Sequence, residues 1–222
     1  VCLLVVWNLL VVTPKLSWRH AMARTAARIM RRMLLLPLRV QGSEVLEGKG
    51  ACVIVANHAS YLDGFVLVST LPASPCYVVK GELADQFFAR VLLRRLGVEF
   101  VERFDALRGA EDAERLMQVV RQGRSAVFFP EGGLTRAPGL RSFRMGAFAA
   151  ASRAGVPVVP VGIRGTRTVL RSDQWLPRRA PMRVLVGEAV YPAGNDLAAA
   201  AALRAYARKQ VLHLCGEPDL QA

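Results

Sequence analysis

The residues best suited to chemistry in this sequence lie in one short stretch, Asn57-His58-Ala59-Ser60-Tyr61-Leu62-Asp63. His58 is one of three histidines, and a neutral imidazole near pH 7 is the best available base for taking a proton from an alcohol. On a regular helix, residues five apart point about 140° away from each other, so His58 and Asp63 would not meet. On a turn between a strand and a helix they could meet, with Asp63 accepting from one ring nitrogen and the other nitrogen acting as the base.

This spacing also has a plain structural explanation. A His and an Asp can cap a helix without taking part in any reaction, and H-x-x-x-x-D occurs often by chance. The spacing by itself leaves both interpretations open. Under the catalytic one, the pair is the base and the orienting group of a triad, and a hydroxyl of the substrate completes it.

A second candidate loop reads Glu131-Gly132-Gly133-Leu134-Thr135-Arg136. Two glycines allow the backbone to approach an anion closely, and the loop N–H groups together with Arg136 could hold phosphate oxygens. A tight turn that carries an incidental arginine explains the same residues. The loop therefore indicates phosphate binding without establishing it.

Both loops follow short apolar stretches that are predicted to be strands. The predicted strands span residues 50–56, 76–80, 125–130, 156–163 and 182–190. The predicted helices span residues 84–96, 106–122, 142–154 and 196–214. Asp105 is the expected N-cap and Gly123 the expected stop of the helix at 106–122. Pro157 and Pro160 favour an edge strand or an irregular stretch at 156–163.

The alternation of these elements predicts a single α/β domain with a mostly parallel central sheet flanked by helices. In such sheets, binding and chemistry occur where loops leave the C-terminal ends of the strands. Both candidate loops stand at such ends.

The composition limits the class of protein. An apolar fraction of 53% excludes a disordered chain. The four cysteines are far apart, as isolated thiols in a reducing compartment would be, and no set of metal ligands is visible. The 30 Lys and Arg against 17 Asp and Glu give a net charge of +13. This charge favours an anionic partner: nucleic acid, an acidic lipid surface or a phosphorylated substrate.

The first residues point toward a lipid surface. Residues 1–12 are almost wholly apolar but fall short of the ~20 residues that a membrane-spanning helix needs. Because the first residue is Val and not Met, we expect a longer hydrophobic segment that has been cut, or a domain excised from a larger protein.

Residues 17–36 have helical spacing with an apolar flank and several cations. The flank comprises Trp18, Met22, Ile29, Met33 and Leu36, and the cations are Arg19, Arg24, Arg28, Arg31 and Arg32. Such a basic amphipathic helix suits the headgroup layer of an anionic membrane. An ordinary domain helix with a solvated arginine face is the alternative. We predict a membrane-associating helical segment over residues 1–37.

Four motifs, taken in order along the chain, resemble those of the glycerolipid acyltransferase superfamily, which includes the 1-acylglycerol-3-phosphate acyltransferases. The motifs are Asn-His-x-x-x-x-Asp at 57–63, Gly97-Val98-Glu99-Phe100-Val101-Glu102-Arg103, Phe129-Pro130-Glu131-Gly132 and Val156-Pro157-Val158-Val159-Pro160-Val161. Each motif is weak alone, but four in the order of the family make a specific signal. The likeness covers most of the chain.

The third motif departs from the usual F-P-E-G-T-R of that family. Gly133 stands where Thr is usual, and Arg136 comes five residues after Glu131 instead of three. Since the family also has members with E-G-x-x-T-R, Thr135 and Arg136 are expected to supply the same cation from a longer loop. The departure affects the prediction of the acceptor more than the prediction of the acyl-transfer reaction.

The resemblance implies a glycerol-phosphate acyltransferase-like catalytic domain over residues 38–216. His58 would deprotonate the acceptor hydroxyl, and Asp63 would fix the tautomer of His58. Arg103, Arg136 and Lys80 would clamp the acceptor phosphate, Phe100 would shape the site, and Glu131 would hold the third loop. The substrate-binding residues that the resemblance implies are Lys80, Phe100, Arg103, Glu131, Gly132, Thr135 and Arg136.

The reaction implied is transfer of a fatty acyl group from acyl-CoA or acyl-carrier protein, as co-substrate, to the free hydroxyl of 1-acyl-glycerol-3-phosphate. No further cofactor and no metal are expected, and the expected place is an anionic membrane, at the cytoplasmic face of the inner or plasma membrane. The alternatives are another acceptor (glycerol 3-phosphate, a lysophospholipid or a lyso-aminolipid) and a catalytically silent basic lipid-binding module.

A nucleic-acid-binding domain is disfavoured because basic strands with interleaved aromatic residues are absent from the sequence. A serine hydrolase is disfavoured because G-x-S-x-G is absent.

Overall fold

The computed structural model describes residues 8–48, 50–71, 74–101, 106–134, 137–171 and 176–221, the side chains of 106–110 excepted. The strands of this part are β1 (Leu38–Gln41), β2 (Val53–Ala56), β3 (Cys76–Lys80), β4 (Glu99–Val101), β5 (Ala126–Phe128), β6 (Val158–Arg164) and β7 (Met182–Val186). They form a seven-stranded sheet in the order β1-β7-β6-β2-β5-β3-β4. Neighbouring strands are parallel except β6 and β7, which are antiparallel. The predicted mostly parallel sheet in a single α/β domain is confirmed.

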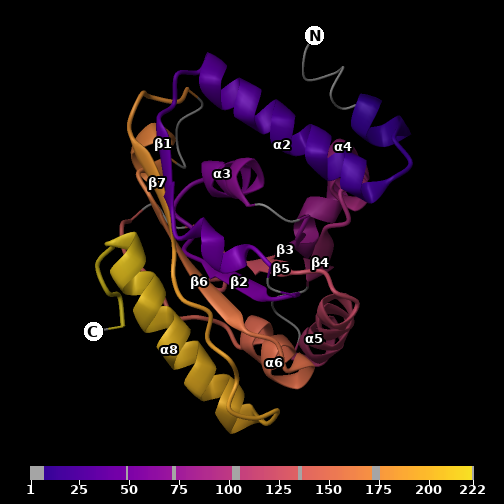
Figure 1. The fold of residues 1–222 in the computed structure, drawn as a ribbon, viewed down its shortest axis with the longest axis vertical. Coiled ribbons are helices and arrows are strands. Elements are labelled where there is room, and N and C mark those ends of the chain that lie inside the picture. Colours follow the sequence, from indigo (N-terminus) through magenta and orange to yellow (C-terminus); the bar gives the residue numbers. More distant parts are fainter. Residues whose placement is uncertain are drawn as a thin grey trace.

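Helices cover both faces of this sheet. They are α2 (Leu16–Met33), α3 (Leu62–Thr70), α4 (Phe87–Arg95), α5 (Ala106–Arg121), α6 (Gly146–Ala154), α7 (Thr166–Val169) and α8 (Leu197–Cys215), with 3-10 turns η1 (Ser43–Leu46) and η2 (Gly81–Asp85). Figure 1 shows α2 and α3 on one side of the sheet and α5, α6 and α8 on the other.

The central strand β2 joins the two layers of the core. All four of its residues are buried, as expected for an interior parallel strand. Because successive side chains point to opposite faces, Val53 and Val55 join the cluster that contains residues of α6 and α8. Ile54 joins the cluster that contains Val66 and Leu67 of α3. The end of β2 is therefore held on both faces, and the candidate His58 turn follows it directly.

β6 lies in the middle of the sheet, so the prediction of an edge or irregular stretch at 156–163 is wrong. The Pro160 carbonyl accepts the Gly187 N–H at 2.8 Å. The Pro160 nitrogen, which carries no hydrogen, faces the same side of the strand, just past the end of β7. Pro157 precedes the strand, and its carbonyl accepts the Val53 N–H at 2.9 Å. Both prolines therefore sit where the neighbouring strands need no donor.

Other predicted elements need smaller corrections. The predicted strand at 50–56 begins at Val53, and the helix predicted at 84–96 divides into η2 and α4. The helix predicted at 142–154 begins at Gly146, because the Arg144 N–H bonds the Pro130 carbonyl at 2.8 Å and holds the preceding residues extended along that loop. Gly123 ends α5 with a φ of 87°, whereas the predicted cap Asp105 lies outside the described residues.

Helix α2 packs on α3, with several of its apolar side chains exposed and several of its arginines directed at the rest of the domain. The apolar side chains of Trp18, Ile29 and Met33 are 56%, 51% and 75% exposed, whereas Leu36 of the predicted flank is buried in the core. Several arginines turn instead toward backbone carbonyls of the domain. Arg19 bonds the Arg95 carbonyl, Arg28 the Ser69 carbonyl at 2.9 Å, and Arg31 the Leu36 carbonyl at 3.0 Å.

No helix in the described part of the chain is long and apolar enough to cross a bilayer. Residues 8–12 are helical, and the first seven residues lie outside the description. Membrane association of residues 1–37 stays a prediction.

Candidate active site

His58 and Asp63 meet on the turn between β2 and α3. The Nδ1 of His58 lies 3.0 Å from Oδ2 of Asp63, and the same oxygen accepts the N–H groups of Ala59 at 2.7 Å and Ser60 at 2.8 Å. Asp63 is fully buried, while the His58 side chain is 20% exposed. With a carboxylate at Nδ1, the hydrogen of a neutral imidazole sits on Nδ1 and the lone pair on Nε2. The turn thus presents a base, and Asp63 both caps the turn and orients that base.

Two further side chains fix the position of this turn. The buried amide of Asn57 donates to the Ile163 carbonyl at 3.0 Å and accepts the Ile163 N–H at 2.7 Å, which ties the end of β2 to β6. Oε1 of Glu131 accepts the His58 N–H at 2.7 Å, and Oε2 accepts the Arg141 N–H at 3.1 Å. The loop after β5 therefore holds the backbone of the candidate base.

The carboxylate of Glu131 is directed at backbone groups and is buried. Burial raises the pKa of the Glu131 carboxyl, whereas its bonds from the N–H groups of His58 and Arg141 and the charge of Arg141 oppose that rise. This environment suits a structural link between two loops.

The ring of Phe129 completes the surroundings of His58. The two rings stack with centroids 4.2 Å apart and planes inclined by 20°. Phe129 lies directly after β5, two residues before Glu131. The same short loop therefore contacts both the backbone and the ring of His58.

The remaining predicted site residues lie at the same edge of the sheet or outside the described part. Lys80 ends β3 with an exposed side chain, and the register places it beside Val101 of β4, one residue after Phe100. Gly132 has a φ of 79°, and a Cβ there would collide with the side chain of Arg144. Three expected substrate-binding residues lie outside the described residues: Arg103, Thr135 and Arg136.

Three residues of the site, Asn57, Phe129 and Arg141, had no predicted role. Asn57 and Phe129 stand in the quoted motifs, so their positions were visible, but their contacts join residues more than 70 positions apart. Nothing in the sequence indicated a role for Arg141 in the site. Its N–H bonds Glu131, and its guanidinium bonds the Gly133 carbonyl of the glycine loop.

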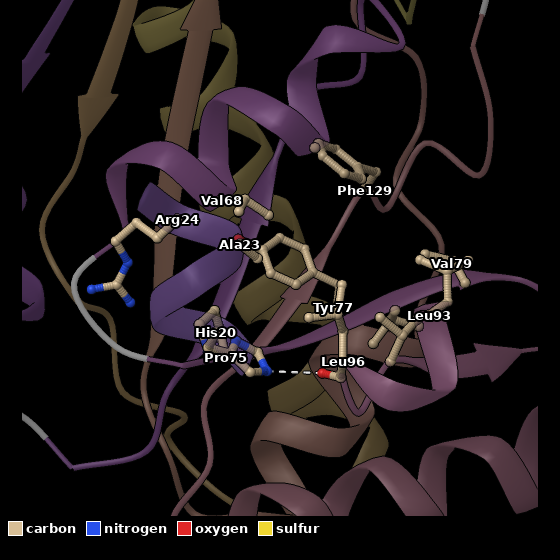
Figure 2. A pocket seen from close by; sticks show the side chains of 13 residues that line it. His20, Ala23, Arg24, Val68, Pro75, Tyr77, Val79, Leu93, Leu96 and Phe129 are labelled. Carbon is tan, nitrogen blue, oxygen red and sulfur yellow. Dashed lines mark hydrogen bonds between the residues drawn. The ribbon is translucent and has the colours of Figure 1, made fainter. Parts of the chain in front are cut away.

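An apolar cavity of about 190 Å³ adjoins the turn of His58 and Asp63 (Figure 2). Its lining includes Gly64, which follows Asp63, and Phe129, which stacks on His58. Most of the wall is apolar and comes from α2, α3, β3, α4 and the residues that follow α4: Ala23, Val68, Val79, Leu93, Leu96 and Val98.

The polar groups of this cavity are largely neutral. Figure 2 shows the Tyr77 ring between Phe129 and His20. Burial lowers the pKa of His20, whose Nε2 lies 2.8 Å from the Leu96 carbonyl, and raises the pKa of Tyr77. Both side chains are therefore neutral near pH 7, and among the described residues of the lining Arg24 carries a charge. Such walls suit an aliphatic chain better than a polar ligand.

Cysteines Cys52, Cys76 and Cys215 are buried and unlinked, and the described residues hold no group of His, Cys, Asp and Glu side chains that could bind a metal ion. The chemistry that these side chains support is proton abstraction by His58, whose ring stacks on Phe129 of the cavity wall.

Comparisons with known proteins agree with the geometry. The family model Acyltransferase matches residues 37–164, more than half of the chain. The chain is 31% identical over 160 residues to the chloroplastic 1-acyl-sn-glycerol-3-phosphate acyltransferase BAT2 of Brassica napus, covering 71% of this chain and 46% of that protein. It is 30% identical over 146 residues to the 1-acyl-sn-glycerol-3-phosphate acyltransferase of Borreliella burgdorferi, covering 65% of this chain and 58% of that protein.

The fold also has a solved counterpart. The crystal structure of the 1-acyl-sn-glycerophosphate (LPA) acyltransferase from Thermotoga maritima superposes with a TM-score of 0.76 at 22% identity, covering 94% of this chain and 84% of that one. The chain spans about half the length of the curated relatives that it matches. The match over residues 37–164, which contains the turn of His58 and Asp63 and the loop of Glu131, shows that the chain belongs to the acyltransferase family.

Proposed function

We propose that this chain transfers a fatty acyl group from a thioester to the free hydroxyl of 1-acyl-glycerol-3-phosphate, giving phosphatidic acid for phospholipid synthesis. The observation that carries the proposal is the pairing of His58 with Asp63 at 3.0 Å beside an apolar cavity. The names of the relatives in Brassica napus and Borreliella burgdorferi support 1-acyl-glycerol-3-phosphate as the acceptor.

In the proposed mechanism, Nε2 of His58 takes the proton of the acceptor hydroxyl as the oxygen attacks the thioester carbonyl carbon. The new C–O bond forms, the C–S bond breaks, and the thiolate leaves with the proton that Nε2 held. His58 carries a positive charge between the two proton transfers, and the buried carboxylate of Asp63 stabilises it. The acyl group passes directly to the acceptor, so no acyl-enzyme forms. Acyl-CoA or acyl-carrier protein is the co-substrate, and we propose no other cofactor.

The acceptor phosphate is proposed to bind among cations at the C-terminal edge of the sheet. Lys80 stands there at the end of β3, and the segment of Arg103 follows the paired strand β4. Arg136 follows the glycine loop of Glu131. Guanidinium groups bind phosphate oxygens in pairs and need no metal for that task.

The apolar cavity is proposed to hold a fatty acyl chain, and Gly64 offers a direct test. A Cβ added at Gly64 meets nothing within 4 Å, so Gly64→Leu should fold normally and occupy the cavity beside Asp63. We expect kcat/KM for a long-chain thioester to fall about tenfold, because burial of each lost CH₂ contributes about 0.8 kcal/mol, and an eight-carbon thioester to lose less. Gly146→Leu, at a glycine of α6 with equally open space, is the control. Equal loss for both chain lengths would contradict this assignment.

We also propose that the protein works at an anionic membrane, at the cytoplasmic face, because its acceptor carries a fatty chain. The exposed apolar side chains of α2 (Trp18, Ile29 and Met33) and the net charge of +13 both suit that surface.

The experiment that tests the function is an acceptor panel with the purified full chain. It compares 1-acyl-glycerol-3-phosphate, glycerol 3-phosphate, a lysophosphatidylcholine and a monoacylglycerol, each with acyl-CoA and with acyl-carrier protein. We expect 1-acyl-glycerol-3-phosphate to give the highest kcat/KM. A higher value for another acceptor would replace the proposed acceptor, and binding of lipids without any transfer would replace catalysis with a lipid-binding role.

A further inference from the structure

His58 is held in the plane of its ring by one group and against its face by another. Asp63 contacts Nδ1 at the ring edge, and Phe129 stacks on the ring face with a centroid distance of 4.2 Å. A hydrogen bond at Nδ1 fixes one ring atom but leaves the ring able to tilt about that contact. An aromatic ring packed on its face opposes such tilting.

Phe129 is itself well placed to serve as a fixed surface. The Gly132 N–H bonds the Phe129 carbonyl at 3.1 Å, and Glu131 of the same loop accepts the His58 N–H at 2.7 Å. The loop that carries the Phe129 ring is thus tied to the backbone of the residue on which the ring stacks. Phe129 also lines the apolar cavity, so it adjoins both the candidate base and the proposed site of the acyl chain.

The stack has an electrostatic consequence in the proposed reaction. A phenyl ring presents a negative face, which attracts a cation more than a neutral group. His58 is neutral before the reaction and positive while it holds the acceptor proton. The attraction is therefore stronger in the transition state than in the ground state, and such an interaction raises kcat.

We propose that Phe129 is a positioning residue for His58, which fixes the plane of the imidazole and stabilises its protonated form in the transition state. This inference rests on the proposed acyl transfer. It assigns to the first residue of the third motif a task separate from binding the acceptor or capping the loop.

The test compares Phe129→Leu, which keeps an apolar side chain without an aromatic face, with Phe129→Tyr, which keeps that face. Phe128→Leu is the matched control, because Phe128 is the neighbouring residue with its side chain in the core cluster on the opposite face of the sheet. For Phe129→Leu we expect kcat to fall about 3- to 30-fold, with the acceptor KM little changed. Phe129→Tyr should recover most of that loss, and Phe128→Leu should lower the melting temperature while kcat stays near the wild-type value.

Three kinetic results would overturn the role of Phe129: an unchanged kcat in Phe129→Leu, a loss confined to KM, or a Phe129→Tyr variant as slow as Phe129→Leu. A wild-type chain that transfers no acyl group would instead contradict the proposed function. The stack can be measured without turnover, because the ring current of Phe129 shifts the NMR signals of the His58 ring protons upfield. These signals should move downfield in Phe129→Leu, and unchanged signals would also overturn the inference.

Discussion

The turn of His58 and the helix α2 use polar groups in opposite ways. In and around the turn, the polar side chains of Asn57, Asp63 and Glu131 are buried, and each makes two or more hydrogen bonds. In α2, arginines bond carbonyls at the domain surface, while apolar side chains point to solvent. Buried polar groups surround His58 in the first region, whereas the second region has an exposed apolar face.

The two regions therefore suit different tasks: the turn can position a base, and α2 can attach the protein to a surface. A buried network with paired donors and acceptors allows one geometry and places a base to within a fraction of an ångström. An exposed apolar stripe is unfavourable in water, and it contributes favourable free energy only when another surface covers it. The cations of α2 contribute to holding this helix on the domain, in addition to any part they play at a membrane surface.

Among the variants that change groups around His58 or on α2, Asp63→Asn is expected to have the largest effect. Oδ2 of Asp63 accepts three bonds, while Oδ1 is buried without a hydrogen-bond partner among the described residues. An asparagine can keep its oxygen toward the three donors, so the turn should keep its shape while losing the negative charge. We expect kcat to fall about 10²-fold or more, measured by steady-state acyl transfer, because the protonated His58 loses its counter-charge.

Asp196→Asn is the control for this variant, because Asp196 caps α8 through the Ala199 N–H and lies away from the turn. A wild-type kcat in Asp63→Asn would contradict the orienting role of Asp63. Equal losses in Asp63→Asn and Asp196→Asn would show a general effect of the charge change.

A smaller effect is expected when the phosphate clamp is removed. Arg103→Ala and Arg136→Ala should each raise the KM for the phosphate-bearing acceptor about 10- to 150-fold, because a lost charge-assisted hydrogen bond costs roughly 1.5–3 kcal/mol. A phosphate-free monoacylglycerol should be used as before. Lys209→Ala, which removes one charge from the exposed side of α8, serves as the control. If both acceptors lose equally, the assignment of the phosphate site is wrong.

The pairing of His58 with Asp63 could be predicted as one of two interpretations, because the information for it is local. A pairing needed a strand-to-helix turn, and the structure places His58 after β2 and Asp63 in the first turn of α3. The contacts of Phe129 and Glu131 with His58 could not be predicted, since they depend on β2 and β5 being neighbours. Strands β1 and β4 were missed because they are edge strands of only four and three residues, too short to show a clear strand pattern in the sequence.

The smallest effect concerns α2. Deletion of residues 1–36 would test attachment poorly, because Leu36 is part of the core and α2 packs on α3, so the deletion would also disturb the fold. The double variant Ile29→Gln/Met33→Gln removes exposed apolar groups only. We expect binding to anionic vesicles to weaken about tenfold, and binding by the wild type to fall but not vanish as salt is raised.

For this variant, kcat on a short-chain soluble acceptor should stay unchanged. Leu197→Gln replaces an exposed apolar residue at the start of α8 and is the control for a general effect on vesicle binding. Equal loss of activity on soluble and vesicle-borne acceptors would assign α2 to the catalytic core alone. Wild-type binding that disappears entirely in high salt would point to a purely electrostatic surface.

The most direct measurement of the central claim is the rate of acyl transfer to 1-acyl-glycerol-3-phosphate by His58→Ala, compared with His213→Ala. His213 lies on the exposed side of α8, so its substitution changes a histidine without touching the turn. We predict that His58→Ala lowers kcat about 10²- to 10⁴-fold while circular dichroism and the melting temperature show an intact fold, and that His213→Ala keeps the wild-type rate. A folded His58→Ala protein that transfers the acyl group at the wild-type rate would contradict the account.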